Sequence, residues 1–328
     1  MALETVNVIG GGAWGTALAQ AAAMAGRPVT LVVRDARQAD EINSQHTNAR
    51  FLGAQKLRTG IKATTIAQPA DIIILALPAQ ATRPVLTALD PALFAGCPVI
   101  VSAKGLETGT LQRQSQIVLD MAPEAIPYVL SGPSFAADVA AGRPTAVTLA
   151  GDDASDTSAL AAALAGPSFR PYAADDRIGV EIAGALKNIY ALACGAVEGA
   201  DLGASARAAL LARGYAEMAR MVVAMGGSAT TLTGLAGLGD LTLTCTSPQS
   251  RNYQFGIALG RGQRVEAIIA AGAKLAEGVS TTPVATELAK SLLVDVPLID
   301  AVNTLLSGTA TIQSIVAGLM SRPLKRED

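Results

Sequence analysis

The sequence predicts a two-domain protein, with a doubly wound α/β sheet domain over residues 1–177 and an all-helical domain over residues 178–328. Runs of Ile, Val and Leu without polar alternation recur through the first half, which is typical of parallel strands buried on both faces. After Pro171 these runs stop, and the apolar residues follow helical spacing. The chain of 328 residues is long enough for two domains and a large core.

The first predicted unit is a strand, a glycine-rich loop, a helix and a second strand. Residues 6–9 and 29–33 are rich in β-forming side chains, and the alanine-rich residues 14–25 predict a helix between them. The loop carries a GxGxxG pattern made of Gly10, Gly12, Ala13 and Gly15. Such glycines permit a tight turn and a close approach to a pyrophosphate, which the helix N-terminus attracts. The unit therefore predicts a Rossmann domain that binds a dinucleotide.

The end of the second predicted strand carries two conflicting signals for the cofactor. Arg34 favours the 2′-phosphate of NADP, whereas Asp35 favours the ribose hydroxyls of NAD. Arg34 comes first and can pair with the phosphate, so we expect NADPH to be favoured slightly over NADH.

Later strands of the first half end in loops with polar or conformationally special residues. Further strands are predicted at residues 71–78, 98–105, 127–134 and 145–150. Lys104, Gly132 and Ser134 follow the carboxyl ends of two of them, where ligands bind in a doubly wound sheet. We expect these residues to share a crevice with the glycine loop. For a single lysine, a solvated loop cation is the alternative.

A long helix is predicted to open the second half, starting at Asp175 or Asp176 and ending near Gly199. Lys187 lies on a face of this helix that is made mostly of small residues, and no carboxylate lies one helical turn away. Periodicity alone favours a surface lysine here. The alternative is a partly desolvated lysine, whose lowered pKa would suit proton transfer near neutral pH.

The segment SPQSRN places Ser250, Arg251 and Asn252 side by side where a helix can begin. A hydroxyl, a guanidinium and an amide at a helix start suit a phosphate or a carboxylate. The alternative is a helix cap with an exposed arginine.

Composition excludes several classes of function. The formal net charge of −2 and the 3% of aromatic residues argue against a nucleic-acid surface. Cys97, Cys194 and Cys245 lie far apart without metal-ligand spacing, so we expect buried thiols and no metal site. The lone histidine, His46, lies in an early polar segment, so in a dehydrogenase a lysine would have to move the proton.

The sequence also predicts a cytoplasmic protein without a membrane span. Its long uncharged runs, at residues 5–26 and 222–239, are broken by glycines and polar side chains. The first ten residues carry no basic region typical of a signal peptide.

Six segments resemble the bacterial NAD(P)-dependent glycerol-3-phosphate dehydrogenases. They are IGGGAWGTALA (9–19), SAKGLE (102–107), LSGPSFA (130–136), EIAGALKNIYALACG (181–195), GLAGLGDLTLTCTSPQSRN (234–252) and AEGVSTT (276–282). The resemblance implies a Rossmann domain followed by a helical substrate domain, usually in a homodimer. The implied reaction is the reversible reduction of dihydroxyacetone phosphate to sn-glycerol 3-phosphate, which feeds phospholipid synthesis.

The resemblance also implies roles for individual residues. Lys187 would be the proton donor and acceptor at the C2 oxygen of the substrate. Matching substrate-binding positions are Lys104, Gly132, Ser134, Lys187, Asp240, Ser250, Arg251 and Asn252. Matching cofactor-binding positions are Trp14, Arg34, Lys104, Ala136, Arg251, Leu275 and Glu277, besides the glycine loop. A small phosphorylated substrate must be recognised largely through its phosphate, and SRN is interpreted as that phosphate site.

Two other functions are compatible with these residues. A related lysine-using dehydrogenase would act on a hydroxy acid or ketopantoate, and SRN could bind its carboxylate. A nucleotide sensor would bind NAD(P) without catalysis, and Lys187 would then matter only for stability.

Overall fold

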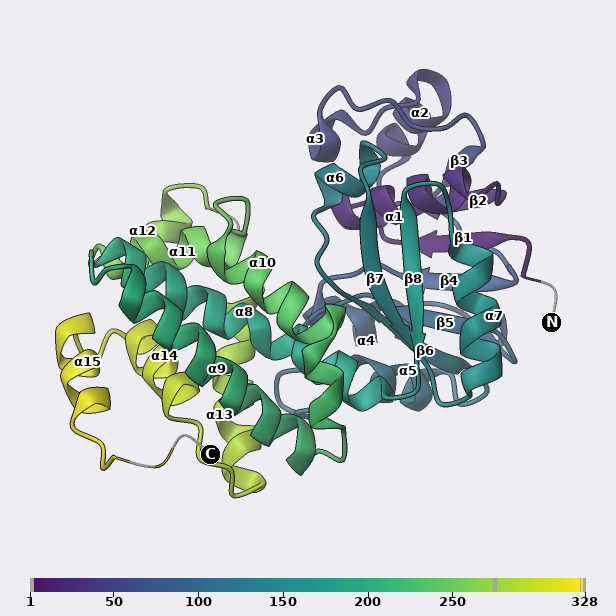
Figure 1. Cartoon of the computed structure of the whole chain (residues 1–328). Coiled ribbons are helices and arrows are strands. Elements are labelled where there is room, and N and C mark those ends of the chain that lie inside the picture. Colours follow the sequence, from purple (N-terminus) through teal and green to yellow (C-terminus); the bar gives the residue numbers. More distant parts are fainter. Residues whose placement is uncertain (1–2, 274–275, 325, 327–328) are drawn as a thin grey trace.

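The computed structural model describes residues 3–273, 276–324 and 326, and its first half is built on one eight-stranded sheet (Figure 1). The strands are β1 (Val6–Ile9), β2 (Val29–Val32), β3 (Ile61–Thr64), β4 (Ile72–Leu75), β5 (Pro98–Val101), β6 (Ile126–Ser131), β7 (Thr145–Ala150) and β8 (Phe169–Ala174). Their order in the sheet is β3-β2-β1-β4-β5-β6-β7-β8. The order reverses between β1 and β4, which is where a doubly wound sheet binds its ligand.

Helices cover both faces of this sheet, so its strands are apolar on both sides. In β4, Ile72 and Ile74 pack in one core cluster, and Ile73 and Leu75 pack in the cluster on the opposite face. The helices of this half are α1 (Ala13–Met24), α2 (Ala36–Gln45), α3 (Ala49–Leu52), α4 (Thr82–Thr87), α5 (Gln114–Met121), α6 (Ala136–Ala140) and α7 (Ala154–Leu164). Helices α1 and α7 pack on the first face, and α4 and α5 pack on the second. The predicted α/β class is confirmed.

Three details of the sheet differ from the sequence prediction. Strand β3 was not predicted, because its four residues include Lys62 and its burial alternates. Strand β7 runs antiparallel to β6 instead of parallel. The strand pattern also does not stop at Pro171, because β8 continues to Ala174 and pairs with β7 in parallel.

The backbone of each outer strand of the sheet has an unusual feature. At β3, the side chain of Asn43 in α2 accepts a hydrogen bond from Ala63 N at 2.8 Å and donates one to Ala63 O at 2.9 Å. At β8, Pro171 lies within the strand and has no N–H to donate.

The second half is helical and is arranged around one buried helix, α8, as Figure 1 shows. Its helices are α8 (Arg177–Gly199), α9 (Ala204–Ala224), α10 (Asp240–Thr246), α11 (Arg251–Gly260), α12 (Val265–Ala270), α13 (Glu277–Ser291), α14 (Pro297–Ser307) and α15 (Ile312–Met320). Helix α8 begins as predicted, since the Asp176 side chain accepts a hydrogen bond from Gly179 N at 2.8 Å. Among the described residues, α8 alone is long and apolar enough to cross a membrane, and its apolar stretch is 100% buried inside the protein.

Glycines let α11 pack unusually close to α8. A Cβ added at Gly195 would lie 2.1 Å from Tyr253 O, and one added at Gly199 would lie 2.1 Å from Ile257 O. The reciprocal Gly256 and Gly260 of α11 face backbone atoms of α8 in the same way. This contact fixes the helix that carries Lys187 against the helix that begins at Arg251.

Candidate functional site

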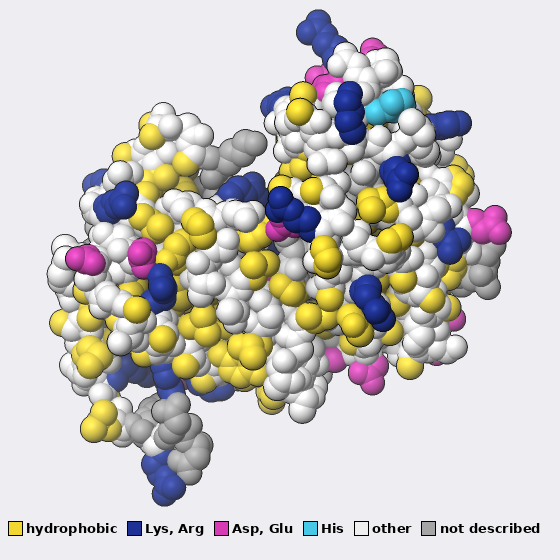
Figure 2. All heavy atoms as spheres, turned by 45° about the horizontal axis from the view of Figure 1, so that its top comes forward, with side chains coloured by type: hydrophobic (Ala, Val, Ile, Leu, Met, Phe, Trp, Pro, Cys, Tyr) yellow, Lys and Arg dark blue, Asp and Glu magenta, His cyan; other side chains and the backbone are white. Residues whose placement is uncertain are grey.

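Two lysines from different halves of the chain meet at one buried carboxylate. Lys187 of α8 donates to Asp240 Oδ1, and Lys104, from the loop after β5, donates to Asp240 Oδ2 at 2.7 Å. Asp240, the first residue of α10, is fully buried, and Lys187 is only 6% exposed. Lys104 also donates to Gly132 O at 3.2 Å, which brings the loop after β6 into the cluster. Figure 2 shows the surface hollowed between the two halves, with Lys and Arg side chains beside the hollow.

Hydroxyl groups complete the surroundings of this ionic cluster. Lys187 Nζ donates to Thr244 Oγ1 at 2.8 Å, and that hydroxyl donates to Asp240 O at 2.6 Å. Ser131 Oγ lies 3.5 Å from Asp240 Oδ2. The sequence prediction missed both residues, although Thr244 lies one helical turn after Asp240 and therefore faces the same way.

Burial and neighbouring charges set the protonation of the cluster. Burial lowers the pKa of Lys187 to about 8, with a further lowering by Lys104 and an opposing effect of Asp240. Burial would raise the pKa of Asp240, but the charges of Lys104 and Lys187 outweigh it and lower that pKa. Asp240 is therefore a carboxylate at neutral pH, and Lys187 can exchange a proton close to physiological pH.

The expectation from periodicity that Lys187 is a surface lysine was wrong, because Lys187 is buried and pairs with Asp240. The carboxylate comes from a different helix, 53 residues along the chain, so spacing within α8 could not reveal it. The small residues on that face do allow a close approach, since a Cβ at Gly184 would lie 2.9 Å from Ser131 Oγ and 3.6 Å from Lys104 Cγ.

The glycine loop leaves the start of α1 open. Gly10 has φ +121°, and a Cβ there would lie 2.4 Å from Ala76 O. A Cβ at Gly15 would lie 1.9 Å from Gly10 O, whereas one at Gly12 would meet nothing within 4 Å. No side chain among the described residues caps the first turn, which Ala13 begins. Free N–H groups and open space at this helix end fit a pyrophosphate.

Other residues predicted to bind the cofactor lie on the same half. The buried indole Nε1 of Trp14, in the first turn of α1, has no hydrogen-bond partner among the described residues. Arg34 follows β2 and is exposed, while the Asp35 carboxylate caps α2 by accepting from Arg37 N at 2.9 Å. Ala136 is the first residue of α6 and packs against the core cluster that contains α1.

The SRN segment starts α11, and its three side chains have different surroundings. Ser250 caps the helix by accepting from Tyr253 N at 3.2 Å, and its hydroxyl hydrogen is not used in that bond. Arg251 is exposed. The buried Asn252 donates to Asn188 Oδ1 at 2.9 Å and accepts from Gly278 N at 2.9 Å.

Asn188 links SRN to the lysine cluster, although the sequence prediction did not include it. Its amide donates to Lys104 O at 3.2 Å and to Glu277 Oε2 at 3.4 Å. Burial raises the pKa of Glu277, against the charges of Arg251, Lys104 and Lys187. Leu275, the remaining predicted cofactor residue, lies outside the described residues.

Ser134 and Gly132 form the loop after β6. Ser134 Oγ donates to Gly132 O at 3.0 Å, so this hydroxyl serves the loop itself. Gly132 has φ +145°, and a Cβ there would lie 2.8 Å from Val147 Cα. A side chain at this position would therefore push β7 away from the loop.

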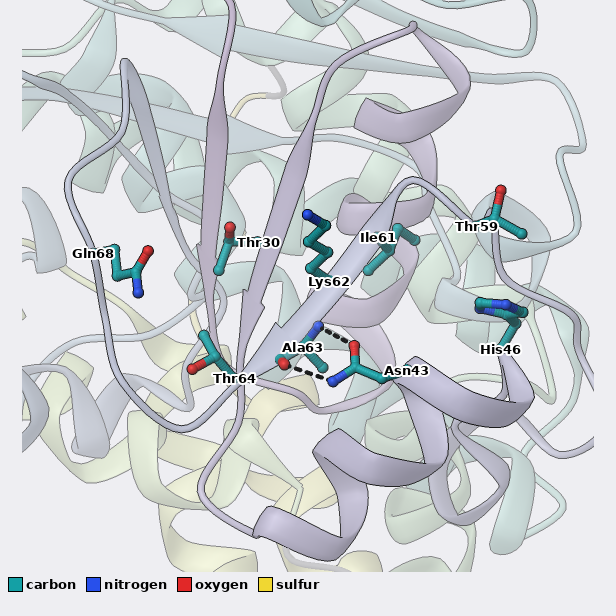
Figure 3. A pocket seen from close by; sticks show the side chains of 9 residues that line it. All are labelled: Thr30, Asn43, His46, Thr59, Ile61, Lys62, Ala63, Thr64 and Gln68. Atoms are coloured by element: carbon teal, nitrogen blue, oxygen red, sulfur yellow. Dashed lines mark hydrogen bonds between the residues drawn. The ribbon is translucent and has the colours of Figure 1, made fainter.

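A separate pocket lies at the outer edge of the sheet and does not belong to this cluster. Its cavity volume is about 520 Å³, and Figure 3 shows its lining side chains from β2, β3, α2 and the neighbouring loops. His46 lies here, at the end of α2, with φ 53°. The lone histidine therefore lines a pocket that does not include Lys187.

The three cysteines are buried, as predicted. Cys97, Cys194 and Cys245 are buried free thiols, and burial raises the pKa of Cys97 to about 11. The described part of the chain holds no group of His, Cys, Asp and Glu suited to a metal ion.

Comparison with known proteins covers almost the whole chain. Residues 5–157 match the family model of the NAD-dependent glycerol-3-phosphate dehydrogenase N-terminus, and residues 176–317 match that of its C-terminus. The chain is 48% identical to the glycerol-3-phosphate dehydrogenase [NAD(P)+] of Rhodopseudomonas palustris strain TIE-1, over 99% of both chains. It is also 48% identical to that of Caulobacter vibrioides, over 100% of both.

A solved structure agrees with this relationship. The crystal structure of glycerol-3-phosphate dehydrogenase from Coxiella burnetii superimposes with a TM-score of 0.91 at 37% identity, covering 98% of this chain and 100% of that one. Together with the family models and the full-length relatives, this places the chain in the NAD(P)-dependent glycerol-3-phosphate dehydrogenase family.

Proposed function

We propose that this protein interconverts dihydroxyacetone phosphate and sn-glycerol 3-phosphate in the cytoplasm, supplying glycerol 3-phosphate for phospholipid synthesis. The observation that carries the proposal is the pair of ammonium groups, from Lys104 and Lys187, held on the buried carboxylate of Asp240 beside the sheet. Reduction of a ketone builds negative charge on its oxygen, and positioned cations stabilise that charge. The nicotinamide cofactor, when bound, supplies or accepts the hydride.

Lys187 holds the proton that the C2 oxygen gains on reduction and loses on oxidation. A pKa of about 8 allows Lys187 to serve in both directions near neutral pH. Asp240 keeps the ammonium group in place, and Lys104 adds a second positive charge on the same carboxylate.

The substrate phosphate binds at the start of α11. Arg251 is exposed and supplies a guanidinium fork, and the Ser250 hydroxyl can donate a second hydrogen bond. Both ends of the Asn252 amide are engaged with the protein, so we assign this residue to holding Asn188 and Gly278 in place. Gly132 and Ser134 lie in the loop after β6, which Lys104 contacts through Gly132 O.

The direct test mixes purified protein with dihydroxyacetone phosphate and follows the absorbance of NADPH and, in parallel, of NADH. We expect rapid oxidation that depends on the substrate phosphate, so dihydroxyacetone without phosphate should react poorly. Oxidation with ketopantoate or another 2-keto acid instead would identify the related dehydrogenase. Tight cofactor binding without turnover of either substrate would identify a nucleotide sensor.

The two directions of the reaction should show opposite pH dependence. Reduction needs the ammonium form of Lys187, so its kcat should fall as pH rises through about 8. Oxidation needs the neutral amine, so its kcat should rise through the same range. Profiles of kcat in both directions, at saturating cofactor, check this expectation. Parallel profiles would contradict the assignment of the proton to Lys187.

We further propose that NADPH is preferred over NADH. The Asp35 carboxylate is engaged as the cap of α2, whereas Arg34 is exposed at the end of β2. Arg34→Ala should weaken NADPH binding by about 10- to 100-fold, the value of one hydrogen bond between charged groups, and should change NADH binding little. Titration of both cofactors measures the effect, with the exposed Arg58→Ala as control. Equal losses for both cofactors would contradict this role.

We propose that the two domains divide between residues 177 and 178, which is supported by the start of α8 at Arg177. We also propose a homodimer, which is supported by the family resemblance.

A further inference from the structure

A second buried ion pair joins the two halves away from Asp240. Glu181 of α8 is 3% exposed, and its carboxylate accepts hydrogen bonds from three groups at the start of α5. Ser115 N donates to Oε1 at 2.8 Å, Ser115 Oγ donates to Oε2 at 2.6 Å, and Arg113 Nη1 donates to Oε2 at 3.0 Å. The Glu181 carboxylate thus accepts a hydrogen bond from an N–H group at the start of α5 that has no partner within the helix. Its negative charge also lies at the positive, N-terminal end of α5.

The residue between these partners holds the loop that carries Lys104. Gln114 is fully buried, and its Nε2 donates to Gly105 O at 3.1 Å. Its Oε1 accepts from Thr82 Oγ1 at 2.6 Å, which fixes the amide in one orientation. The segment 113–115 therefore binds the Lys104 loop through the side chain of Gln114. It binds α8 through the side chains of Arg113 and Ser115.

We propose that Glu181 and Gln114 are positioning residues, which set the placement of Lys187 relative to Lys104 by way of the segment 113–115. The proposal rests on the proposed function, in which both lysines act on the substrate. Glu181 precedes Lys187 by six residues on one helix, which corresponds to a rise of about 9 Å. Because the helix moves as a rigid unit, a displacement of Glu181 would also displace the ammonium group of Lys187.

The two lysines need such a link because they come from different halves. Asp240 attracts both, and Asn188 of α8 donates to Lys104 O at 3.2 Å, but contacts at this one point of α8 do not by themselves fix the direction in which the helix approaches the sheet. The bonds of Glu181 and Gln114 are made by fully or nearly buried groups to backbone and side-chain partners, which fixes direction as well as distance. Catalysis is sensitive to such placement, because a shift of about 1 Å can cost about 100-fold in rate.

The test uses three variants of the full-length protein: Glu181→Gln, Ser115→Ala and Gln114→Met. We expect kcat for dihydroxyacetone phosphate reduction to fall about tenfold in the folded variants, within the range that misplacement costs, while KM for NADPH stays unchanged. The pH at which kcat declines should also move, because the pKa of Lys187 depends on its distance from the charges around it. A purely structural contact would change neither kcat nor the pH profile of the folded protein.

The matched control is Asp152→Asn. It removes the ion pair in which Arg177, at the start of the same helix, donates to the exposed Asp152 at 2.7 and 3.0 Å. This variant should keep the wild-type kcat and pH profile. Circular dichroism and thermal melting establish that each variant is folded at the assay temperature.

The outcomes separate the two proposals. If Glu181→Gln fails to fold, the milder Ser115→Ala and Gln114→Met decide. Wild-type kcat and pH profiles in these two variants, even with lowered melting temperatures, would overturn the positioning role. If the wild-type protein does not reduce dihydroxyacetone phosphate, or if Lys187→Ala is fully active, the proposed function fails instead.

Discussion

Replacing Lys187 with methionine is expected to lower kcat by about 10²- to 10⁴-fold in both directions, the usual contribution of a positioned acid or base. Methionine keeps most of the aliphatic volume in this buried site but has no exchangeable proton. The substrate oxygen would then have to exchange its proton with water. Steady-state kinetics at saturating substrate and cofactor measure the loss, and cofactor titration should show nearly unchanged binding.

The control for this variant is Lys62→Met. Lys62 is an exposed lysine of β3, in the same protein but at the edge pocket of Figure 3. Its replacement should leave kcat unchanged. If Lys187→Met retained more than about a tenth of the wild-type kcat, a loss far below the usual 10²-fold minimum, another group would have to be the proton donor.

Replacing Asp240 with asparagine should destabilise the protein as well as inactivate it. The change removes the carboxylate that both ammonium groups contact, and breaking a buried ion pair costs about 3–5 kcal/mol. The attraction that raises the pKa of Lys187 would disappear, so this pKa should fall below about 8. Urea denaturation measures the stability, and the pH profile of any remaining reduction activity should move to lower pH.

The surface variant Asp120→Asn provides the comparison. It removes a carboxylate that pairs with Arg83 at 3.2 Å on the protein surface, where such pairs contribute at most about 1 kcal/mol. A similar small loss for Asp240→Asn would show that the buried lysines lose their protons and adapt, which contradicts a tightly held triad.

Local sequence signals predicted those parts of the site that are formed by residues close together in the sequence. The GxGxxG loop, the strand before it and the helix after it lie within about 25 residues, so their spacing reports their geometry. The start of α8 after its N-cap Asp176 follows from a capping residue in the same way, and the helix ends at Gly199, as predicted. These elements fixed the α/β class and the place of the cofactor loop.

Contacts between distant segments could not be predicted from spacing. The pairing of Lys187 with Asp240, and the hydrogen bonds of Asn188 to Lys104 O and to Asn252, join helices and loops that are separate in the sequence. Periodicity alone favoured a surface lysine, because groups that surround Lys187, such as Asp240 and Thr244, come from other elements. Only tertiary packing desolvates it.

In the SRN segment the structure shows a helix cap with an exposed arginine, as in the alternative interpretation, and the phosphate site stays a prediction. Ser250 is a helix cap, as the alternative interpretation required. The same geometry leaves Arg251 exposed at the start of α11, where an anion binds favourably. Asn252 differs from both interpretations, because its amide is used inside the protein.

The outer strands of the sheet bear on how the protein behaves at high concentration. An unpaired strand edge is a template on which strands of other molecules can add, leading to aggregation. At β3 the hydrogen-bonding groups of Ala63 are already occupied by Asn43, as a neighbouring strand would occupy them. At β8 Pro171 interrupts the row of donors. The Asn43 side chain at β3 and Pro171 at β8 thus protect the two edges of the sheet in different ways. The strands between these edges are rich in aggregation-prone Ile and Val.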